Sequence, residues 1–133
     1  MKLTRTADYA VRLLISLAAN GGEGTVKKKA EELNAPANHM VKVVHLLSRK
    51  GFLLTKKGKG GGFKLAVSPS KIRLSEVIEA AEGPVVVSDC LLHPEDCKLS
   101  KGCNFRKLLF VLRNDFKKAL HDKTINDLAK KRG

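Results

Sequence analysis

Apolar residues recur at helical spacing through the first part of the chain. Residues 3–19 predict a first helix, which Thr4 is placed to cap and which an Asn-Gly-Gly sequence ends. Two shorter helices are expected at residues 25–33 and 37–50, with Asn38 or a neighbour capping the second of them. Its apolar stripe leaves a polar face exposed. Two such helices separated by an Asn-Ala-Pro break are typical of a helix-turn-helix.

Two short β-prone runs follow, at residues 52–57 and 63–67, on either side of the glycine-rich segment 58–62. Together they predict a β-hairpin with lysines at its tip. Glycine permits positive φ angles and close approach of the backbone to a partner. A glycine run alone would indicate no more than a turn. Directly after a helix-turn-helix, such a hairpin is typical of a wing that contacts the DNA backbone or minor groove.

The second half of the chain alternates between helical and irregular patterns. Residues 74–81 predict a compact helix, and residues 84–103 are expected to form a loop. Residues 104–121 predict one long helix with an apolar stripe, and Thr124 opens a last short helix with a capping box. The stripe needs a surface to cover it. We expect a partner subunit, with packing against the first helix of the same chain as the alternative.

The chain is therefore predicted to be mainly α-helical with a small β-hairpin wing. We expect a winged helix-turn-helix domain over residues 1–83, a cysteine loop over residues 84–103, and a dimerisation helix with a C-terminal segment over residues 104–133. A chain of 133 residues suffices for one hydrophobic core. Because no long apolar run or signal sequence is seen, we expect a cytoplasmic protein with no membrane partner.

Positive charge is concentrated in the first part of the chain. Residues 1–73 hold 15 Lys and Arg against 4 Asp and Glu, whereas residues 74–133 hold 11 against 9. This asymmetry indicates a surface that meets phosphates, with a generally solvated lysine surface as the alternative. The lysine run at residues 27–29 is expected to face solvent or phosphate. Five Phe, one Tyr and no Trp are few for the stacking platforms that bind single strands, so double-stranded DNA is the expected partner.

The helix that begins near residue 37 is expected to enter the major groove, and the hairpin to lie against the backbone or in the minor groove. Lysine contacts to phosphate would make the affinity strongly dependent on salt. A dimer with two-fold symmetry would read a pseudo-palindromic operator. The candidate DNA-binding residues are Lys28, Asn38, His39, Lys42, Lys57, Lys59 and Gly60.

Three cysteines, Cys90, Cys97 and Cys103, fall within 14 residues of a chain that has no others. Three thiols cannot all pair as disulfides, and such a group is typical of a metal or iron–sulfur site in a reducing compartment. With His93 the loop supplies four ligands for tetrahedral zinc, although it lacks the tight cysteine pairs of zinc fingers. Three thiolates and an outside ligand would equally hold an iron–sulfur cluster. Unliganded or redox-active thiols are the third interpretation.

An enzyme with a cysteine nucleophile is a further class to consider. Such an enzyme would need an activating base and an oxyanion site. The sequence shows no Cys/His/Asp arrangement of that kind and no strand–loop–helix motif that cradles a phosphate. We therefore expect a binding protein rather than an enzyme.

Four segments carry a family likeness when they are taken together. They are Leu-Thr-x-x-x-Asp-Tyr-Ala at residues 3–10, Asn-His-Met-Val-Lys-Val-Val at residues 38–44, Gly-Lys-Gly-Gly-Gly at residues 58–62, and the three-cysteine loop before a long helix. In this combination the chain resembles the Rrf family of iron–sulfur winged-helix repressors over essentially its whole length. The resemblance implies a homodimeric transcriptional repressor whose operator binding is controlled by a 2Fe–2S or 4Fe–4S cluster that senses nitric oxide or redox state.

Within this family the likeness is strongest to the nitric-oxide-sensing branch. Another branch, the regulators of cluster assembly, has a histidine ligand three residues after the last cysteine, where this chain has Arg106, which cannot ligate. In the nitric-oxide-sensing branch the resemblance implies an aspartate ligand from the first helix of the partner subunit, and Asp8 matches it. A hard carboxylate is a weak ligand for iron in a thiolate cluster, so it would be displaced readily.

Two features leave the fourth ligand open. Asp8 lies one helical turn from Arg12, so an ion pair within the helix is its alternative role. The spacing of six residues between Cys90 and Cys97 is also longer than the resemblance leads us to expect. The alternative ligands in the same loop are His93, Glu95 and Asp96.

Overall fold

The computed structural model describes residues 2–58 and 61–130. Its α-helices are α1 (Arg5–Ala19), α2 (Val26–Glu32), α3 (Ala37–Arg49), α4 (Leu74–Glu82), α5 (Asn104–His121) and α6 (Ile125–Ala129). Its strands are β1 (Glu23–Gly24), β2 (Leu53–Lys56) and β3 (Gly62–Leu65). Short 3-10 turns are η1 (Pro69–Lys71), η2 (Asp89–Leu91) and η3 (Pro94–Asp96).

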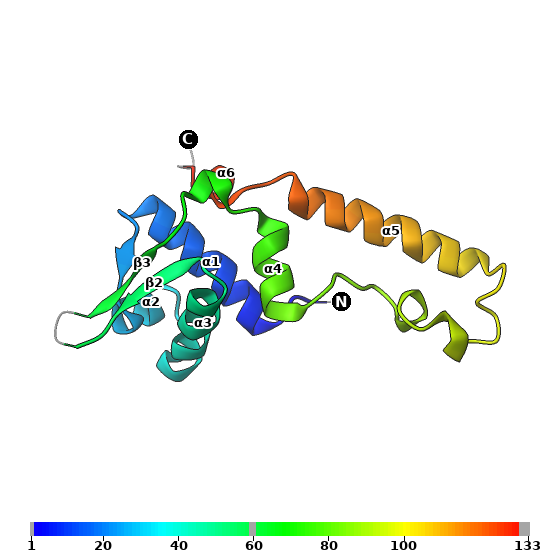
Figure 1. The fold of residues 1–133 in the computed structure, drawn as a ribbon, viewed down its shortest axis with the longest axis horizontal. Coiled ribbons are helices and arrows are strands. Elements are labelled where there is room, and N and C mark those ends of the chain that lie inside the picture. The colour runs from blue at the N-terminus through cyan, green and yellow to red at the C-terminus, as the bar shows by residue number, and fades with distance from the viewer. Residues whose placement is uncertain (1, 59–60, 131–133) are drawn as a thin grey trace.

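The molecule has a compact part and an arm (Figure 1). The compact part contains α1 to α4, the sheet and α6, and α5 extends away from it. The segment between α4 and α5 runs out beside α5 and turns back at the far end, so η2 and η3 lie away from the compact part (Figure 1). α5 contacts α4 at one end and η2 at the other. The wing, at the β2–β3 end, and the cysteine loop therefore lie at opposite ends of the molecule.

α1 lies at the centre of the hydrophobic core. Its Leu13 and Leu17 have no exposed surface and pack with Met40 and Leu47 of α3. Ile125 of α6 joins the same cluster from the end of the chain. Burial of each such side chain contributes roughly 1.5–3 kcal/mol relative to leaving it exposed. These contacts hold the candidate recognition helix α3 against a rigid centre.

Threonine side chains begin three of the helices. Thr4 and Thr25 each accept a hydrogen bond from a backbone N–H in the first turn of their helix, and Thr124 forms the predicted capping box. The N-cap of α3 differs from the prediction of Asn38 or a neighbour. It is Pro36, which forms no side-chain cap hydrogen bond. Asn38 lies inside the first turn, where its Oδ1 accepts a hydrogen bond of 2.9 Å from the N–H of the next residue.

The wing is larger than the predicted hairpin. β2 pairs antiparallel with β3, with Leu53 opposite Leu65 and Lys56 opposite Gly62. β3 also pairs antiparallel with β1, so the strand order is β1-β3-β2. β1 has only two residues, too few to show a β pattern in the sequence. It is a strand because it pairs with β3.

Two glycines permit the close approach of these backbones. A Cβ atom at Gly61 would lie 2.5 Å from the carbonyl oxygen of Lys56, and a Cβ atom at Gly62 would lie 2.5 Å from that of Gly24. Any other residue would force the strands apart. The shape of the wing therefore requires glycine at positions 61 and 62.

The predicted fold class is confirmed, because the chain is mainly helical with a small antiparallel wing. α4 ends at Gly83, whose φ of +83° is a conformation that suits glycine. α5 spans the predicted residues. None of the described helices combines the length and the apolar content that crossing a lipid bilayer requires.

Candidate DNA-binding surface and cysteine site

α3 has one buried and one exposed face. Met40, Val43 and Leu47 are fully buried and point into the core. Because these residues recur at helical spacing, the residues between them face away from α1 and the core. The exposed polar residues of α3 are Asn38, Lys42, His45 and Arg49.

His39 differs from these residues. Its Nε2 lies 3.1 Å from Oγ1 of Thr6 in α1, and its ring meets the Tyr9 ring edge-on, with 5.0 Å between centroids and 87° between planes. The side chain is half-buried against α1. Its contact with DNA remains a prediction.

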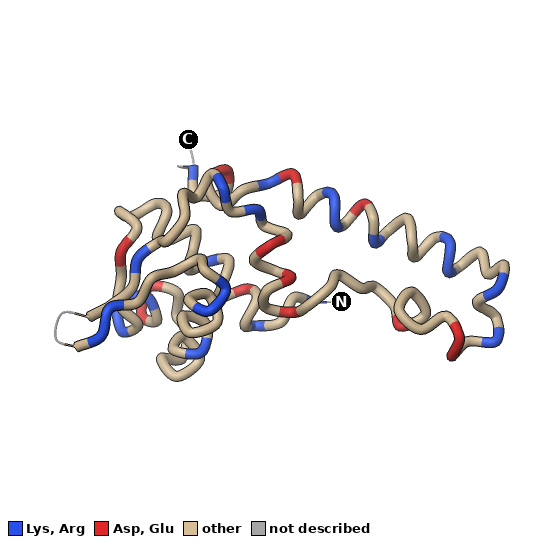
Figure 2. Tube along the Cα trace, in the orientation of Figure 1, with Lys and Arg blue, Asp and Glu red and all other residues tan. Residues whose placement is uncertain are grey.

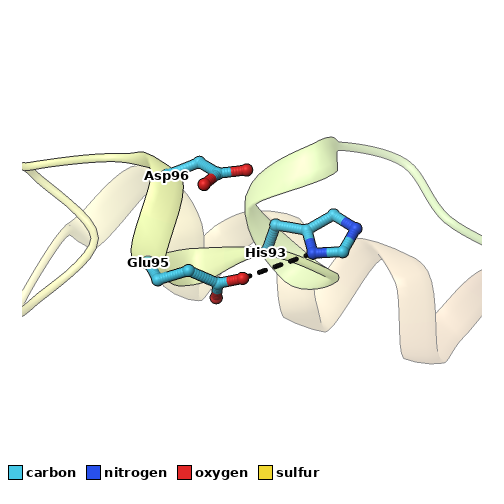
Figure 3. A group of neighbouring side chains, drawn as sticks. All are labelled: His93, Glu95 and Asp96. Carbon is cyan, nitrogen blue, oxygen red and sulfur yellow. Dashed lines mark hydrogen bonds and ion pairs between the residues drawn. The ribbon is translucent and has the colours of Figure 1, made fainter.

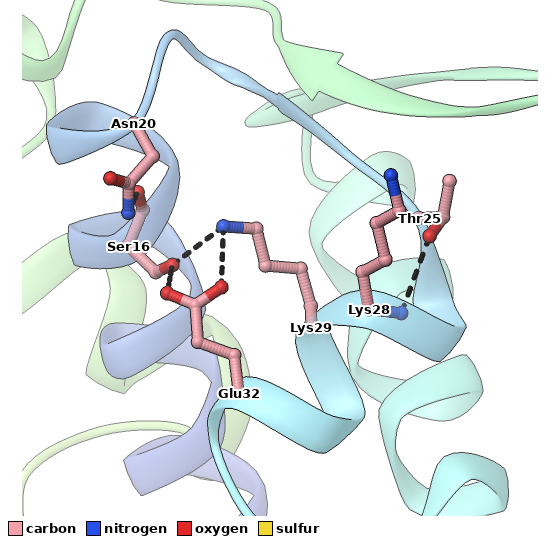
Figure 4. A network of polar contacts seen from close by, with 6 residues as sticks. All are labelled: Ser16, Asn20, Thr25, Lys28, Lys29 and Glu32. Carbon is pink, nitrogen blue, oxygen red and sulfur yellow. Dashed lines mark hydrogen bonds and ion pairs between the residues drawn. The ribbon is translucent and has the colours of Figure 1, made fainter.

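The lysine run of α2 divides into exposed and buried members. Lys27 and Lys28 are exposed, as expected, but Lys29 is only 5% exposed. Its Nζ donates hydrogen bonds to Oγ of Ser16 at 2.7 Å and to Oε2 of Glu32 at 3.0 Å (Figure 4). The prediction that the whole run faces solvent or phosphate is wrong for Lys29. Successive helical residues are about 100° apart, so the third lysine turns toward α1.

Glu32 completes this contact between α1 and α2. The Ser16 hydroxyl donates to its Oε1 at 2.7 Å (Figure 4). That hydrogen bond, followed by the one from Lys29, lowers the pKa of Glu32 below its usual value. Because a buried ammonium is costly without a partner, the three groups hold α2 against α1 as a unit.

The wing and the start of α2 enclose a basic cavity of about 470 Å³, whose lining includes Lys28 and Lys56. Lys57 is also exposed at the end of β2. Lys59 and Gly60, two of the predicted DNA-binding residues, lie outside the described residues. Lys and Arg residues occur on α2, α3 and the wing, and also along α5, whereas the charged residues of α4 are acidic (Figure 2). The exposed basic residues of α2, α3 and the wing make up the candidate DNA-binding surface.

The three cysteines bracket the loop at the end of the arm. Cys90 lies in η2, Cys97 follows η3, and Cys103 immediately precedes α5. Cys97 is exposed, and the other two are half-buried. The Oγ of Ser88 lies 3.4 Å from the Sγ of Cys90.

Arg106 connects the two ends of this loop. Its backbone N–H donates to the Sγ of Cys103 at 3.5 Å, so a cysteine caps α5. Its side-chain Nε donates to the carbonyl oxygen of Cys90 at 3.3 Å. Arg106 therefore fixes the backbone near two of the three thiols.

One group of three potential ligands for a single metal ion is found among the described residues. It consists of His93, Glu95 and Asp96, all exposed, with the Nδ1 of His93 lying 3.3 Å from Oε1 of Glu95 (Figure 3). The three cysteines are described but do not form such a group, since their sulfur atoms are not all within 4.8 Å of one another. A single zinc ion would require that proximity. An iron–sulfur cluster does not, because its thiolates bind different iron atoms.

Asp8 forms the predicted intrahelical ion pair. Both carboxylate oxygens accept hydrogen bonds from the Nε of Arg12, at 3.0 and 2.9 Å. The pair is largely exposed, with 42% of the Asp8 side chain accessible. α1 belongs to the compact part, and the cysteine loop lies at the end of the arm (Figure 1). The structure therefore does not bring Asp8 and the cysteines of one chain together.

α5 exposes a large apolar surface. Among its residues, all of which are described, only Leu109 and Leu120 are buried. Beside its base lies an apolar cavity of about 720 Å³, lined by the segment after α4, by Leu3 and by Phe116. The exposed apolar residues of α5 are Phe105, Leu108, Phe110, Val111, Leu112 and Phe116.

Comparison with known proteins identifies the family of this chain. The Rrf2 family model, described as iron-dependent transcriptional regulator, matches residues 3–131. The HTH-type transcriptional regulator NsrR of Bacillus subtilis is 32% identical over 133 residues, which cover 98% of this chain and 91% of that protein.

Solved structures show the same architecture. CymR, the global cysteine regulator of B. subtilis, is 27% identical and superposes with a TM-score of 0.80 over 97% of this chain and 96% of that one. IscR of T. potens, at 18% identity and a TM-score of 0.73 over 100% of this chain and 94% of that one, shows the fold alone. The predicted family resemblance is confirmed, and the relatives are regulators rather than enzymes. The chain belongs to the Rrf2 family of DNA-binding transcriptional regulators.

Proposed function

We propose that this protein is a homodimeric repressor whose operator binding is controlled by an iron–sulfur cluster that responds to nitric oxide or redox state. The observation that carries this proposal is the loop before α5, which holds three free cysteines, one of which, Cys103, accepts a hydrogen bond from the first turn of that helix. The identity of 32% to NsrR, a regulator of the same family, supports it.

The donor set fits an iron–sulfur cluster better than a single metal ion. Cys90, Cys97 and Cys103 supply three sulfur ligands, and Cys103 is the N-cap of α5, where its sulfur accepts a backbone hydrogen bond. Hydrogen bonds to cluster sulfur tune such sites. A cluster bound there would supply iron that reacts with oxidants or nitric oxide.

A second subunit would complete the site. α5 is about 27 Å long, and six of its large apolar residues are exposed. Pairing of two such arms would bury these residues and bring the cysteine loop of one chain toward α1 of the other. In that arrangement Asp8 of the partner subunit would be the fourth ligand, in place of its ion pair with Arg12.

The DNA-binding surface consists of α3 in the major groove, with the wing and α2 on the backbone. In this arrangement Asn38 and Lys42 face base edges or phosphates, and Lys28 and Lys57 contact phosphates. Lys59 and Gly60 extend the wing. Two copies related by a two-fold axis would read a pseudo-palindromic operator.

Control of DNA binding requires that the two states of the site have different affinities for the operator. Release of Asp8 alters the position of α1 within the dimer. α1 holds the centre of the core against which α3 packs. The two recognition helices then lose their match to the two half-sites.

A regulator that responds through its thiols, without a cluster, is the second candidate. The exposed thiol of Cys97 and the likeness to CymR favour it. A zinc-stabilised site that includes His93 is less well supported, because no three of His93, Cys90, Cys97 and Cys103 lie within 4.8 Å of one another.

The content of iron and acid-labile sulfide distinguishes these candidates. The protein is purified without air, and its visible absorbance, iron, sulfide and zinc are measured beside a variant with all three cysteines changed to alanine. We expect a brown wild-type protein with iron and sulfide, and a colourless variant. A colourless, iron-free wild-type protein would contradict the proposal, and zinc bound to it would favour the zinc alternative.

A further inference from the structure

His39 lies on the first turn of α3 but contacts α1. Its Nε2 is 3.1 Å from the hydroxyl oxygen of Thr6, and the edge-on contact with Tyr9 covers its ring. The two partners lie 33 and 30 positions earlier in the chain. This contact connects the start of the recognition helix to the start of the central helix.

Side-chain contacts at the start of α3 are sparse. Pro36 begins the helix without a side-chain hydrogen bond, and Asn38 bonds to the backbone of its neighbour. Met40, the residue after His39, is fully buried in the core. Two residues therefore set the direction of the first turn of α3: Met40 through its packing in the core, and His39 through its contacts with α1.

The corresponding part of α1 is tightly packed. Ala7 and Ala10 have no exposed surface, so this part of the helix has close neighbours on the face that points inward. Thr6 and Tyr9 lie on the neighbouring face and contact His39. Close-packed elements transmit displacements rather than absorbing them. A shift of the first two turns of α1 would therefore move the start of α3.

We propose that His39 is a positioning residue that sets the direction of the recognition helix from α1, and that it is not a base or phosphate contact. We further propose that the contact of His39 with Thr6 and Tyr9 transmits a displacement from the start of α1 to α3. This second part rests on the proposed function, because Asp8, the proposed ligand, lies between Thr6 and Tyr9 in the same turns.

A double-mutant cycle tests the positioning role. Thr6→Val removes the hydroxyl, and His39→Phe removes the ring nitrogens while keeping an aromatic ring beside Tyr9. Loss of one hydrogen bond predicts an operator affinity about three- to tenfold weaker for each single variant. Because both substitutions break the same contact, the double variant is expected to be no weaker than either one.

The salt dependence of operator affinity separates positioning from phosphate contact. A positioning residue leaves the slope of log affinity against log salt unchanged, whereas loss of a phosphate contact reduces it. Thr6→Ser, which keeps the hydroxyl, should bind like the wild type. His121→Phe, at the exposed end of α5 and outside the proposed DNA-binding surface, controls for the introduction of an aromatic ring. Additive effects, or an unaffected Thr6→Val variant, would overturn the assignment.

The transmission role has its own test on the iron-loaded protein. Thr6→Val should reduce the ratio of operator affinities before and after nitric oxide treatment, while the visible absorbance decays at the wild-type rate. An unchanged ratio would overturn the transmission role. If the protein holds no cluster, this part fails together with the proposed function, and the result of the double-mutant cycle still decides the positioning role.

Discussion

Arg106 donates a hydrogen bond from its Nε to the carbonyl oxygen of Cys90, 3.3 Å away, and so closes the cysteine loop onto the first turn of α5. The two residues are sixteen positions apart along the chain. The same residue donates its backbone N–H to the sulfur of Cys103. A single arginine therefore fixes the backbone near the first and the last cysteine, although its own side chain is no metal ligand.

Arg106→Ala should weaken retention of the cluster. Residues that orient metal ligands typically contribute about tenfold or more to affinity. We expect iron to be lost to a chelator about tenfold faster from the variant than from the wild type, at unchanged helix content. The measurement is the decay of visible absorbance in the presence of the chelator. Lys107→Ala, at the exposed neighbouring position, is the control and should behave like the wild type.

The contact between Ser16, Lys29 and Glu32 should make stability depend on pH. The folded-state pKa of Glu32 is lowered, mainly by the hydrogen bond from Ser16 and then by that from Lys29. The carboxylate therefore stabilises the fold above its unfolded-state pKa of about 4.3, and this stabilisation is lost as the pH falls through the lower folded-state pKa.

Denaturant unfolding at several pH values measures this effect. Glu32→Gln should reduce the free energy of unfolding near neutral pH and flatten its decline below about pH 5. Glu31→Gln, at an exposed position of the same helix, is the matched control. Equal pH profiles for Glu32→Gln and the wild type would show that the carboxylate does not stabilise the fold.

Operator binding should be strongly dependent on salt. A protein that makes six to ten phosphate contacts loses about 10³–10⁵ in affinity between 50 and 200 mM salt. Lys28→Ala and Lys57→Ala should each reduce the slope by about 1. Lys117→Ala, on the exposed surface of α5, should not change it. An affinity that scarcely varies with salt would show that these lysines do not contact phosphate.

The apolar face of α5 should hold two subunits together. Burial of a leucine contributes roughly 1.5–3 kcal/mol, so Leu108→Asp should shift the protein toward the monomer by more than tenfold in dimer dissociation constant. Sedimentation at several concentrations measures the shift. Lys117→Asp introduces the same side chain nine residues later, about 2.5 turns along α5 and therefore on the side opposite Leu108, and should leave the dimer intact. A wild-type protein that sediments as a monomer would rule out this interface.

Much of the fold was predictable because its signals are local. The Thr124 capping box and the full length of α5 agree with the sequence prediction, since caps and apolar spacing are written in neighbouring residues. Threonine at position 4 also predicts the observed cap. The cysteine spacing indicated a ligand-binding loop but could not show which atoms of the loop lie together.

The structure differs from the sequence prediction where contacts with residues distant in the chain determine the conformation. Lys29 is buried because Ser16, thirteen positions earlier, accepts its hydrogen bond. A run of three lysines gives no sign of that partner. β1 exists because β3 lies beside it, and His39 turns inward because Thr6 and Tyr9 are within reach. Helical periodicity alone places His39 on the same exposed surface as Asn38 and Lys42.

Substitutions at Asp8 and Arg12 distinguish the two roles proposed for Asp8, cluster ligand and ion-pair partner. Asp8→Ala removes both roles, whereas Arg12→Ala removes only the ion pair that the structure contains. We expect Asp8→Ala to bind the operator about as weakly as the nitric-oxide-treated wild type and to show little further response to nitric oxide. Arg12→Ala should keep the response. A normal response from Asp8→Ala would exclude Asp8 as the residue that couples the site to DNA.

The most direct test of the central claim is the operator affinity of the iron-loaded wild-type protein before and after treatment with nitric oxide, measured without air at one salt concentration. We predict that affinity falls by at least about tenfold as the visible absorbance is lost, since typical coupling free energies are 1–3 kcal/mol. Equal affinities for the loaded, the treated and the iron-free protein would contradict control of DNA binding by a cluster at Cys90, Cys97 and Cys103.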